Sequence, residues 1–245
     1  MYQDFAAARQ LKELTAQRRL KEISQHVPLS GRWLDVGCAN GVFVETVGEH
    51  VQAEGVELSQ NAVMEGRERG LNLAIGSIEN FPKDIPFDCI TAFDVLEHVV
   101  DPNQFISAIH ERLADHGTVV LTVPNCGGIV RKLMGKRWYF YIPEEHLHYF
   151  DKQNLSDLLA QHGFEVLHTG ATFKPMTFRY ALLQFKEFNP LIYKVLNFFG
   201  SLIPSKWKTA PMPLPIGEIK IIGRRIPVPV NVEGKKRELE SAATA

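Results

Sequence analysis

Residues 33–47 read WLDVGCANGVFVETV, and this stretch decides the fold of the chain. An apolar run ends at Asp35, Gly37 and Gly41 bracket three other residues, and a second apolar run follows. A strand that stops at Asp35 and a helix that starts near Gly41 leave a tight turn with outward-facing backbone amides. Turns of this kind bind nucleotides in α/β proteins.

The composition limits the functional classes. The 245 residues are 45% apolar and carry a formal net charge of -1, which fits one globular domain with a full core. A near-neutral chain lacks the basic excess of a general nucleic-acid binder, so no nucleic-acid partner is expected. Cys38, Cys89 and Cys126 are odd in number and form no C-x-x-C pair, so neither a disulfide framework nor a zinc ribbon is indicated.

The N-terminal region lacks the pattern of a targeting segment. Residues 1–24 are charged and amphipathic, unlike a signal peptide, and the chain holds no run of about 18 charge-free apolar residues that would span a bilayer. We therefore expect a cytoplasmic protein with reduced cysteines.

Strand and helix patterns alternate along the chain, which predicts an α/β fold with a parallel sheet. Strands are expected at 32–37, 51–58, 71–76, 87–94, 117–125, 164–173 and 217–225. Helices are expected at 5–23, from 41, at 61–70, from 102 to 114 and at 151–163. Asp101 and Asp151 are predicted N-caps, and Gly163 is predicted to follow the end of its helix. Residues 1–230 are expected to form a single domain, and 231–245 a disordered tail.

The turn at 37–41 differs from a dinucleotide-binding turn. That turn needs G-x-G-x-x-G, and an acid two residues before its first glycine, such as Asp35, would repel a pyrophosphate. A ligand with an ammonium group and no phosphate, such as S-adenosylmethionine, suits it better. Glu57 follows about 20 residues after Gly37, where a carboxylate can accept both ribose hydroxyls. A nicotinamide-dependent dehydrogenase is therefore disfavoured.

The sequence resembles the class I S-adenosylmethionine-dependent methyltransferases, and most closely the branch that acts on small molecules in quinone, polyketide and sugar biosynthesis. The resemblance runs in order through residues 33–168. It is carried by LDVGCANG, GVELS, FDCITAFDVLEHVVDP, GTVVLTVPN and PEEHLHYF followed by LSDLLAQHGFEV. It implies a Rossmann-like, seven-stranded and mostly parallel sheet with an antiparallel last strand, helices on both faces and a helical substrate cap built from 126–150 and 175–215.

The resemblance also implies a set of cofactor-binding residues. The methionine end would be lined by Asp35, Gly37, Cys38, Ala39 and Gly41, the ribose by Glu57 and Leu58, the adenine by Ser77 and Ile78, and the methionine ammonium by Asp94 and Val95. Two positions depart from the family pattern. Ala39 stands where glycine is commoner, which requires a negative φ at that position. Ser77 replaces the usual aspartate toward the adenine amino group.

Methyl transfer to a hydroxyl needs a base, and histidine is the natural base near neutral pH. The candidates are His146, His148 and His98, in that order. Two structural alternatives remain open: His146 could bind the Glu144-Glu145 turn and hold a lid, and His98 could be a capping or core residue. An H-x-H pair also occurs in metal sites, but no third histidine or cysteine is suitably placed in the sequence, so no metal is predicted.

Two segments of the expected cap carry information about the acceptor. Residues 130–142 place four cations beside aromatic residues, which is typical of a solvated face but would also suit an anionic group. Residues 176–207 show apolar residues at helical spacing on both sides of Pro190, which predicts two short helices. They could belong to the core, roof an apolar acceptor, or rest on a membrane surface with Arg179, Lys186 and Lys194 toward the headgroups.

The function predicted from the sequence is methyl transfer from S-adenosylmethionine to a small molecule, with oxygen favoured as the acceptor atom and nitrogen or carbon as the alternatives. A non-catalytic protein that binds S-adenosylmethionine and engages a protein partner is the alternative from another class. The sequence leaves open the acceptor and the oligomeric state.

Overall fold

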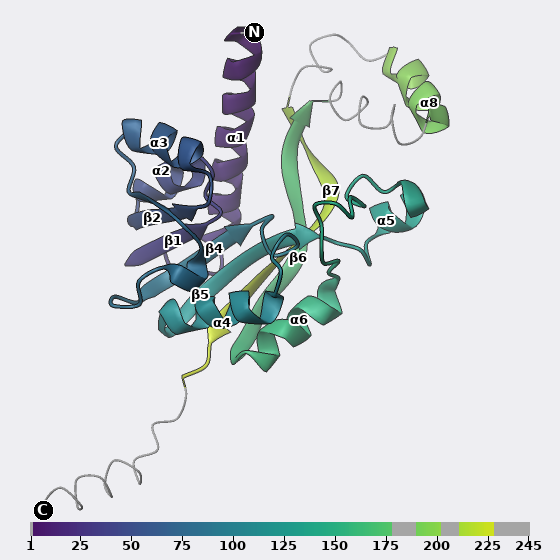
Figure 1. Cartoon of the computed structure of the whole chain (residues 1–245). Helices are drawn as coiled ribbons and strands as arrows, with labels where there is room; N and C mark the ends of the chain where they lie inside the picture. Colours follow the sequence, from purple (N-terminus) through teal and green to yellow (C-terminus); the bar gives the residue numbers. More distant parts are fainter. Residues whose placement is uncertain (1, 178–189, 202–210, 228–245) are drawn as a thin grey trace, which may run out of the picture.

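A single mixed sheet organises the computed structural model, which describes residues 2–177, 190–201 and 211–227 (Figure 1). The strand order is β3-β2-β1-β4-β5-β7-β6. β7 is antiparallel to both of its neighbours, whereas the other strand pairs are parallel. The strands are β1 Arg32–Val36, β2 Gln52–Glu57, β3 Leu73–Ile75, β4 Phe87–Phe93, β5 Leu113–Pro124, β6 Phe164–Thr177 and β7 Pro211–Arg225. The predicted Rossmann-like sheet with an antiparallel last strand is confirmed.

Helices cover both faces of the sheet, as predicted (Figure 1). On one face, α4 and α6 supply apolar side chains to the larger core cluster. On the other face, α1 and α2 pack with Trp33 and Phe93 in a second cluster. The α-helices are α1 Tyr2–Ile23, α2 Val42–Gly48, α3 Gln60–Glu68, α4 Pro102–Arg112, α5 Ile129–Met134, α6 Lys152–Gln161 and α8 Pro190–Ser201. Two 3-10 helices span Ile78–Asn80 and Gly135–Arg137.

Both predicted helix caps are present. Asp101 accepts hydrogen bonds from the backbone amides of Asn103 and Gln104 at 2.8 and 3.2 Å. Asp151 closes a capping box with Asn154 at the start of α6. Gly163 follows the end of α6 with a φ of +77°. Local hydrogen-bonding chemistry therefore fixes these boundaries, which is why the sequence could predict them.

Three strand boundaries differ from the predicted ones by more than two residues. β5 begins at Leu113 instead of 117, because Leu113 pairs with Phe87 ahead of an irregularity in the β4–β5 ladder. β6 and β7 continue past 173 and before 217. They pair with each other from Phe173↔Pro215 to Thr177↔Pro211, beyond the point where β5 ends. The ends of the predicted cap at 175–177 and 211–215 are thus strand, in a two-stranded ribbon that tolerates its prolines because it has open edges.

Parts of the sequence predictions lie outside the described residues. α8 begins at Pro190, as predicted for the second helix of 176–207, but the first helix falls in 178–189. The whole tail predicted to be disordered, 231–245, and the segment 202–210 also lie outside. The single-domain assignment of residues 1–230 stays a prediction.

No helix among the described residues is both long enough and apolar enough to cross a membrane.

The topology brings several strand ends to one place. β1, β2, β4 and β5 run parallel, so their carboxyl ends meet at one edge of the sheet (Figure 1). The chain order reverses between β1 and β4, which lie side by side although they are not consecutive. Ligands of open α/β sheets bind at such a reversal, so this edge is where a site is expected.

Candidate functional site

The turn after β1 is held by the carboxylate of Glu57, at the end of β2. One carboxylate oxygen accepts the amide of Ala39 at 3.0 Å, and the other accepts the amide of Ser59 at 2.8 Å. Ala39 has a φ of 48°, so the requirement for a negative φ at this position was wrong. A left-handed alanine costs about 1 to 2 kcal/mol. A charged hydrogen bond from its own amide offsets a cost of that size.

The two glycines of the turn are required by packing as well as by conformation. Gly37 and Gly41 have φ values of +70° and +81°. A Cβ on Gly37 would lie 2.4 Å from Cγ2 of Val95, and a Cβ on Gly41 would lie 2.7 Å from Cδ1 of Leu71. The turn can therefore approach the residues after β4 only because residue 37 lacks a side chain.

Two cavities open on either side of this turn and share Gly37 and Asp94. The first has a volume of about 500 Å³ and lies between the turn, α1 and β6. The second has a volume of about 490 Å³ and lies between the ends of β2 and β4 and the start of α4. The first is lined by Asp35, Cys38 and Ala39, and the second by Glu57, Leu58, Ser77, Ile78 and Val95. All predicted cofactor residues except Gly41 thus line one of the two cavities.

Asp94 lies where the cavities meet and is already bound to two cations. One carboxylate oxygen accepts from Lys174 Nζ at 2.8 Å and from Arg19 at 3.0 Å. The other accepts from the hydroxyl of Thr122 at 3.0 Å. Burial alone would raise the pKa of Asp94, but Lys174 and Arg19 lower it below its ordinary value. Asp94 is therefore a carboxylate near neutral pH.

Arg19 and Lys174 are functional candidates that the sequence analysis missed. Arg19 projects from α1, and its guanidinium carbon lies 4.2 Å from the centroid of the Phe93 ring. Its Nε is buried and finds no hydrogen-bond partner within residues 2–177, 190–201 and 211–227. Lys174 lies on β6 at the start of the two-stranded ribbon, and both residues line the first cavity. No local pattern marks them, because they lie 75 and 80 residues from Asp94 in the chain.

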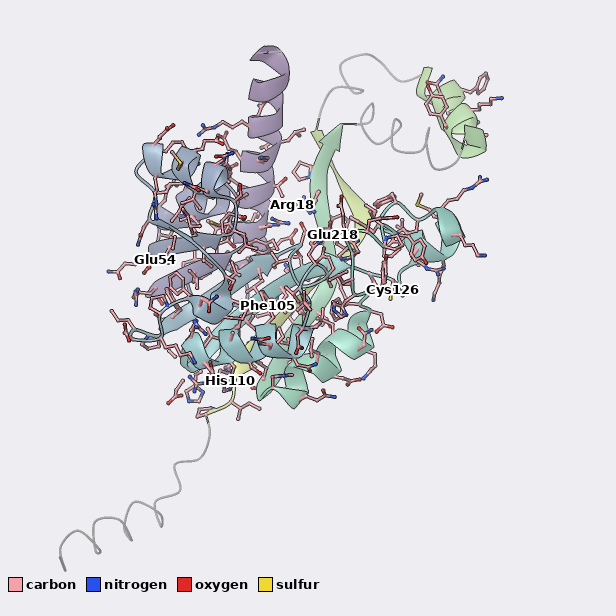
Figure 2. The ribbon with its side chains drawn as sticks, in the orientation of Figure 1. Arg18, Glu54, Phe105, His110, Cys126 and Glu218 are labelled. Carbon is pink, nitrogen blue, oxygen red and sulfur yellow. The ribbon has the colours of Figure 1, made fainter. Side chains whose placement is uncertain are left out.

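Glu218 is a third residue that the sequence analysis missed. It lies in the middle of β7 (Figure 2), is 2% exposed, and accepts a hydrogen bond from Lys174 Nζ at 2.6 Å. Its second oxygen, Oε2, is buried, and no group in the described part of the chain hydrogen-bonds to it. Burial and the charge of Asp94 raise the pKa of Glu218 to about 7, even though Lys174 opposes the shift.

Asp35 lies buried beneath the first cavity, where its carboxylate is costly to ionise. Its Oδ1 accepts a hydrogen bond from Thr91 at 2.5 Å. Burial raises the pKa of Asp35 to about 7, and the hydrogen bond from Thr91 and the charge of Arg19 only partly counter this effect. A site that holds a buried carboxylate without a paired cation is prepared for a polar or cationic ligand group.

The three candidate histidines separate into a pair and a single residue. The His98 and His146 rings lie 4.7 Å apart, edge to face, and His98 lines the second cavity while His146 is buried behind it. His148 lies apart from this pair, with Nε2 3.4 Å from the carbonyl oxygen of Val100. The side chain of His146 contacts the carbonyl oxygen of Phe140 through Nδ1. The contact with the Glu144-Glu145 turn that was considered for His146 is made instead by His98, whose Nδ1 contacts the carbonyl oxygen of Glu145.

These carbonyl contacts fix the tautomers of the histidine pair. A carbonyl oxygen accepts only, so Nδ1 of each ring carries the proton, and Nε2 of each neutral ring is an acceptor. Burial lowers the pKa of His146, which favours its neutral form. His98 is therefore a histidine in a cavity wall with a free basic nitrogen.

Glu97 completes a cluster with the histidine pair. Glu97, His98 and His146 each offer one ligand atom, and these atoms lie within 4.8 Å of one another. Together they could hold a metal ion, but this group contains His146 without His148, so it is not the H-x-H pair considered in the sequence. The prediction of no metal remains a prediction. Burial raises the pKa of Glu97 to about 8, and its Oε2 has no partner.

The segment 126–150 covers this end of the sheet, and its two ends are hydrogen-bonded to each other. The amide of Cys126 donates to the carbonyl of Phe150 at 2.8 Å, next to a bridge between Asn125 and Phe150. The amide of Leu147 donates to the carbonyl of Glu97, also at 2.8 Å. Its cations, Arg131, Lys132, Lys136 and Arg137, are exposed.

Comparison with known proteins places these features in a family. A family model described as a methyltransferase domain matches residues 7–169. The ubiquinone biosynthesis O-methyltransferase of Xylella fastidiosa (strain 9a5c) is 38% identical over 117 residues, which cover 44% of this chain and 48% of that protein. The protein of the same name from Thiobacillus denitrificans is 26% identical over 181 residues, which cover 67% of this chain and 78% of that protein.

The chain thus spans about half the length of the Xylella relative. Among solved structures, a SAM dependent methyltransferase from Archaeoglobus fulgidus superposes with a TM-score of 0.57 at 16% identity, over 87% of this chain and 94% of that one. At this identity the likeness shows the fold alone.

The buried carboxylate of Asp35 yields a prediction about stability. Its folded pKa lies above the ordinary value of 3.8, so its contribution to stability is present below pH 4 and is lost as pH rises toward 7. Asp35→Asn cannot ionise. We expect the stability of the variant relative to wild type to rise by about 2 to 4 kcal/mol between pH 4 and pH 8, measured by urea unfolding.

The exposed Asp84→Asn variant serves as the control, with no such change across the same range. A relative stability of Asp35→Asn that does not vary with pH would mean that Asp35 ionises freely in the folded protein.

Proposed function

The chain belongs to the methyltransferase domain family, and from this premise we propose that it transfers the methyl group of S-adenosylmethionine to a hydroxyl of a small molecule. The observation that carries the proposal is the pair of cavities joined at Gly37 and Asp94. One has charged walls that suit an amino acid, and the other has an acid and apolar walls that suit a nucleoside. The cofactor of the family has these two halves.

The second cavity fits the adenosine half. Each oxygen of Glu57 accepts one backbone amide and keeps a lone pair, which a ribose hydroxyl can use. Leu58, Ile78 and Val95 supply apolar walls for the adenine. Ser77 stands in place of the usual aspartate, and Gln104 of α4 lines the same cavity, so its amide oxygen is a second candidate acceptor for the adenine amino group.

The first cavity fits the amino-acid half. The unpartnered Nε of Arg19 is a buried donor, which suits the carboxylate of the ligand. Asp94 is the acceptor proposed for the ammonium group. α1 contributes one wall of this cavity, so the N-terminal helix belongs to the site and does more than cover the sheet.

The chain must align the two reactants, exclude water and accept a proton. The cofactor supplies an electrophilic methyl group on a sulfonium, so alignment provides much of the rate. We assign the role of base to His98 ahead of His146, since His98 lines a cavity and its Nε2 is a free acceptor. His146 packs against the His98 ring and would orient it.

Transfer to oxygen is supported by the names of the curated relatives, which are O-methyltransferases of ubiquinone biosynthesis. The partner proposed here is accordingly a small hydroxylated molecule. A screen of candidate acceptors, in which the release of S-adenosylhomocysteine is measured, would determine the size and charge of this molecule.

We further propose that α8 makes a peripheral contact with a membrane surface. α8 exposes Val195, Phe198 and Phe199, with Phe198 68% exposed, and Lys194 lies exposed on the same helix. Apolar residues beside a cation are typical of helices that lie on anionic membranes. An apolar acceptor dissolved in a membrane would be reached from such a position.

The first prediction tests the ribose contact. Glu57→Ala removes a charged acceptor and is expected to weaken binding of S-adenosylhomocysteine by about 2 to 4 kcal/mol in calorimetry. The exposed Glu68→Ala variant on α3 controls for the loss of an acid on the surface. Unchanged affinity in a folded Glu57→Ala protein would reject the ribose assignment.

The second prediction tests the base. His98→Ala is expected to lower kcat by roughly 100-fold or more, with affinity for S-adenosylhomocysteine close to wild type. His148→Ala is the matched control, because His148 lies apart from the pair, and it should keep most of the turnover. Near wild-type kcat in His98→Ala would show that alignment suffices without this histidine.

The third prediction tests the membrane contact. The protein is expected to float with vesicles that contain phosphatidylglycerol, and Phe198→Asp is expected to abolish flotation. Asn197→Asp adds the same charge to α8 without removing an apolar side chain, so it should reduce flotation only in part. Failure of the wild-type protein to float would reject the membrane contact and leave a lid or a core role for α8.

A further inference from the structure

Lys174 is shared between two carboxylates at the entrance of the first cavity. Its Nζ lies 2.8 Å from Oδ2 of Asp94 and 2.6 Å from Oε1 of Glu218. Asp94 also binds Arg19, so two cations already neutralise the carboxylate that is proposed to accept the ammonium group of the cofactor. A third cation at Asp94 would be repelled by both of them.

Glu218 can accept a further hydrogen bond from Lys174 through its second oxygen, Oε2. Its Oε2 is buried and has no hydrogen-bond partner among the described residues, while Oε1 accepts from Lys174. A buried carboxylate oxygen left unpaired is costly, so native proteins rarely keep one without a function. A lysine ammonium has three donors and can bind both oxygens of one carboxylate. The structure therefore offers Lys174 a complete alternative to Asp94.

We propose that Glu218 is a positioning residue: when the amino-acid end of the cofactor binds, Lys174 moves from Asp94 to both oxygens of Glu218, and Asp94 becomes free for the ammonium group. This inference rests on the proposed function. No covalent step is involved, since one ion pair replaces another. The total charge near Asp94 is conserved, because the incoming ammonium takes the place of the Lys174 ammonium.

The position of Glu218 in the fold supports this role. Glu218 pairs with Pro124 at the end of β5, and Lys174 pairs with Leu214 at the start of the β6–β7 ribbon. Nζ of Lys174 therefore lies between Glu218, beside the end of β5, and Asp94, which follows β4, so a movement of the Lys174 side chain is enough for the exchange. A static reading, in which Glu218 merely neutralises Lys174, leaves Oε2 of Glu218 unexplained.

Two ligands separate the exchange from a general loss of structure. S-adenosylhomocysteine carries the amino-acid end, whereas 5′-methylthioadenosine has the same nucleoside without it. In Glu218→Gln, Lys174 keeps Asp94 as its only carboxylate. We expect calorimetry to show about tenfold or greater loss of affinity for S-adenosylhomocysteine, and a change of less than about twofold for 5′-methylthioadenosine.

Removing the Lys174 ammonium is not expected to weaken the binding of S-adenosylhomocysteine, because Asp94 then has no competing lysine. Lys174→Met is expected to bind S-adenosylhomocysteine at least as tightly as wild type, and adding Glu218→Gln to it should change the affinity by less than about threefold. Lys174→Met also keeps the test valid if Glu218→Gln fails to fold. Glu165→Gln removes an exposed partner of Arg224 on the same strand pair and serves as the matched control.

Three results would overturn the inference. Equal losses for both ligands in Glu218→Gln would indicate a structural role, and equal affinity for S-adenosylhomocysteine in Glu218→Gln and wild type would show that no exchange occurs. A marked loss in Lys174→Met would make Lys174 a direct ligand. If wild type binds neither ligand, the proposed function itself fails, which is distinct from all three.

Discussion

The hydrogen bond from the amide of Ala39 to the carboxylate of Glu57 is the constraint on which the rest of the site depends. It ties the turn after β1 to the end of β2 and keeps a non-glycine residue in the left-handed region. With the turn held there, Gly37 can lie against Val95, and the two cavities form on its two sides. The same carboxylate keeps lone pairs for a ligand, so one side chain both shapes the site and offers an acceptor to it.

The buried charges of the site lower the stability of the folded state. Burial raises the pKa of Asp35, Glu97 and Glu218, whereas two cations lower that of Asp94. Apolar residues of similar size would stabilise the same positions better, because ionised groups lose their hydration on burial. Acids, cations and unpaired polar atoms gathered at one sheet edge are therefore more readily explained by a ligand with charged ends than by stability.

Distant segments of the chain complete the site around the edge of the sheet. α1 brings Arg19, β6 brings Lys174, and the segment 126–150 brings His146 behind His98. The β6–β7 ribbon and α8 then extend away from the sheet (Figure 1). The core of the fold is that of the family, and these additions are where selection of an acceptor would be decided.

The sequence by itself determined the elements whose causes are local: the alternation of strands and helices, the caps at Asp101 and Asp151, and the turn with its following acid. What only the tertiary structure decided was the conformation of Ala39, the pairing of His146 with His98, the length of the β6–β7 ribbon, and the convergence of Arg19, Lys174 and Glu218 on Asp94. The physical reason is the distance along the chain between the interacting residues. A cap or a turn is satisfied by atoms within a few residues, whereas an ion pair between residues 75 or 80 positions apart exists only after the sheet has placed its strands.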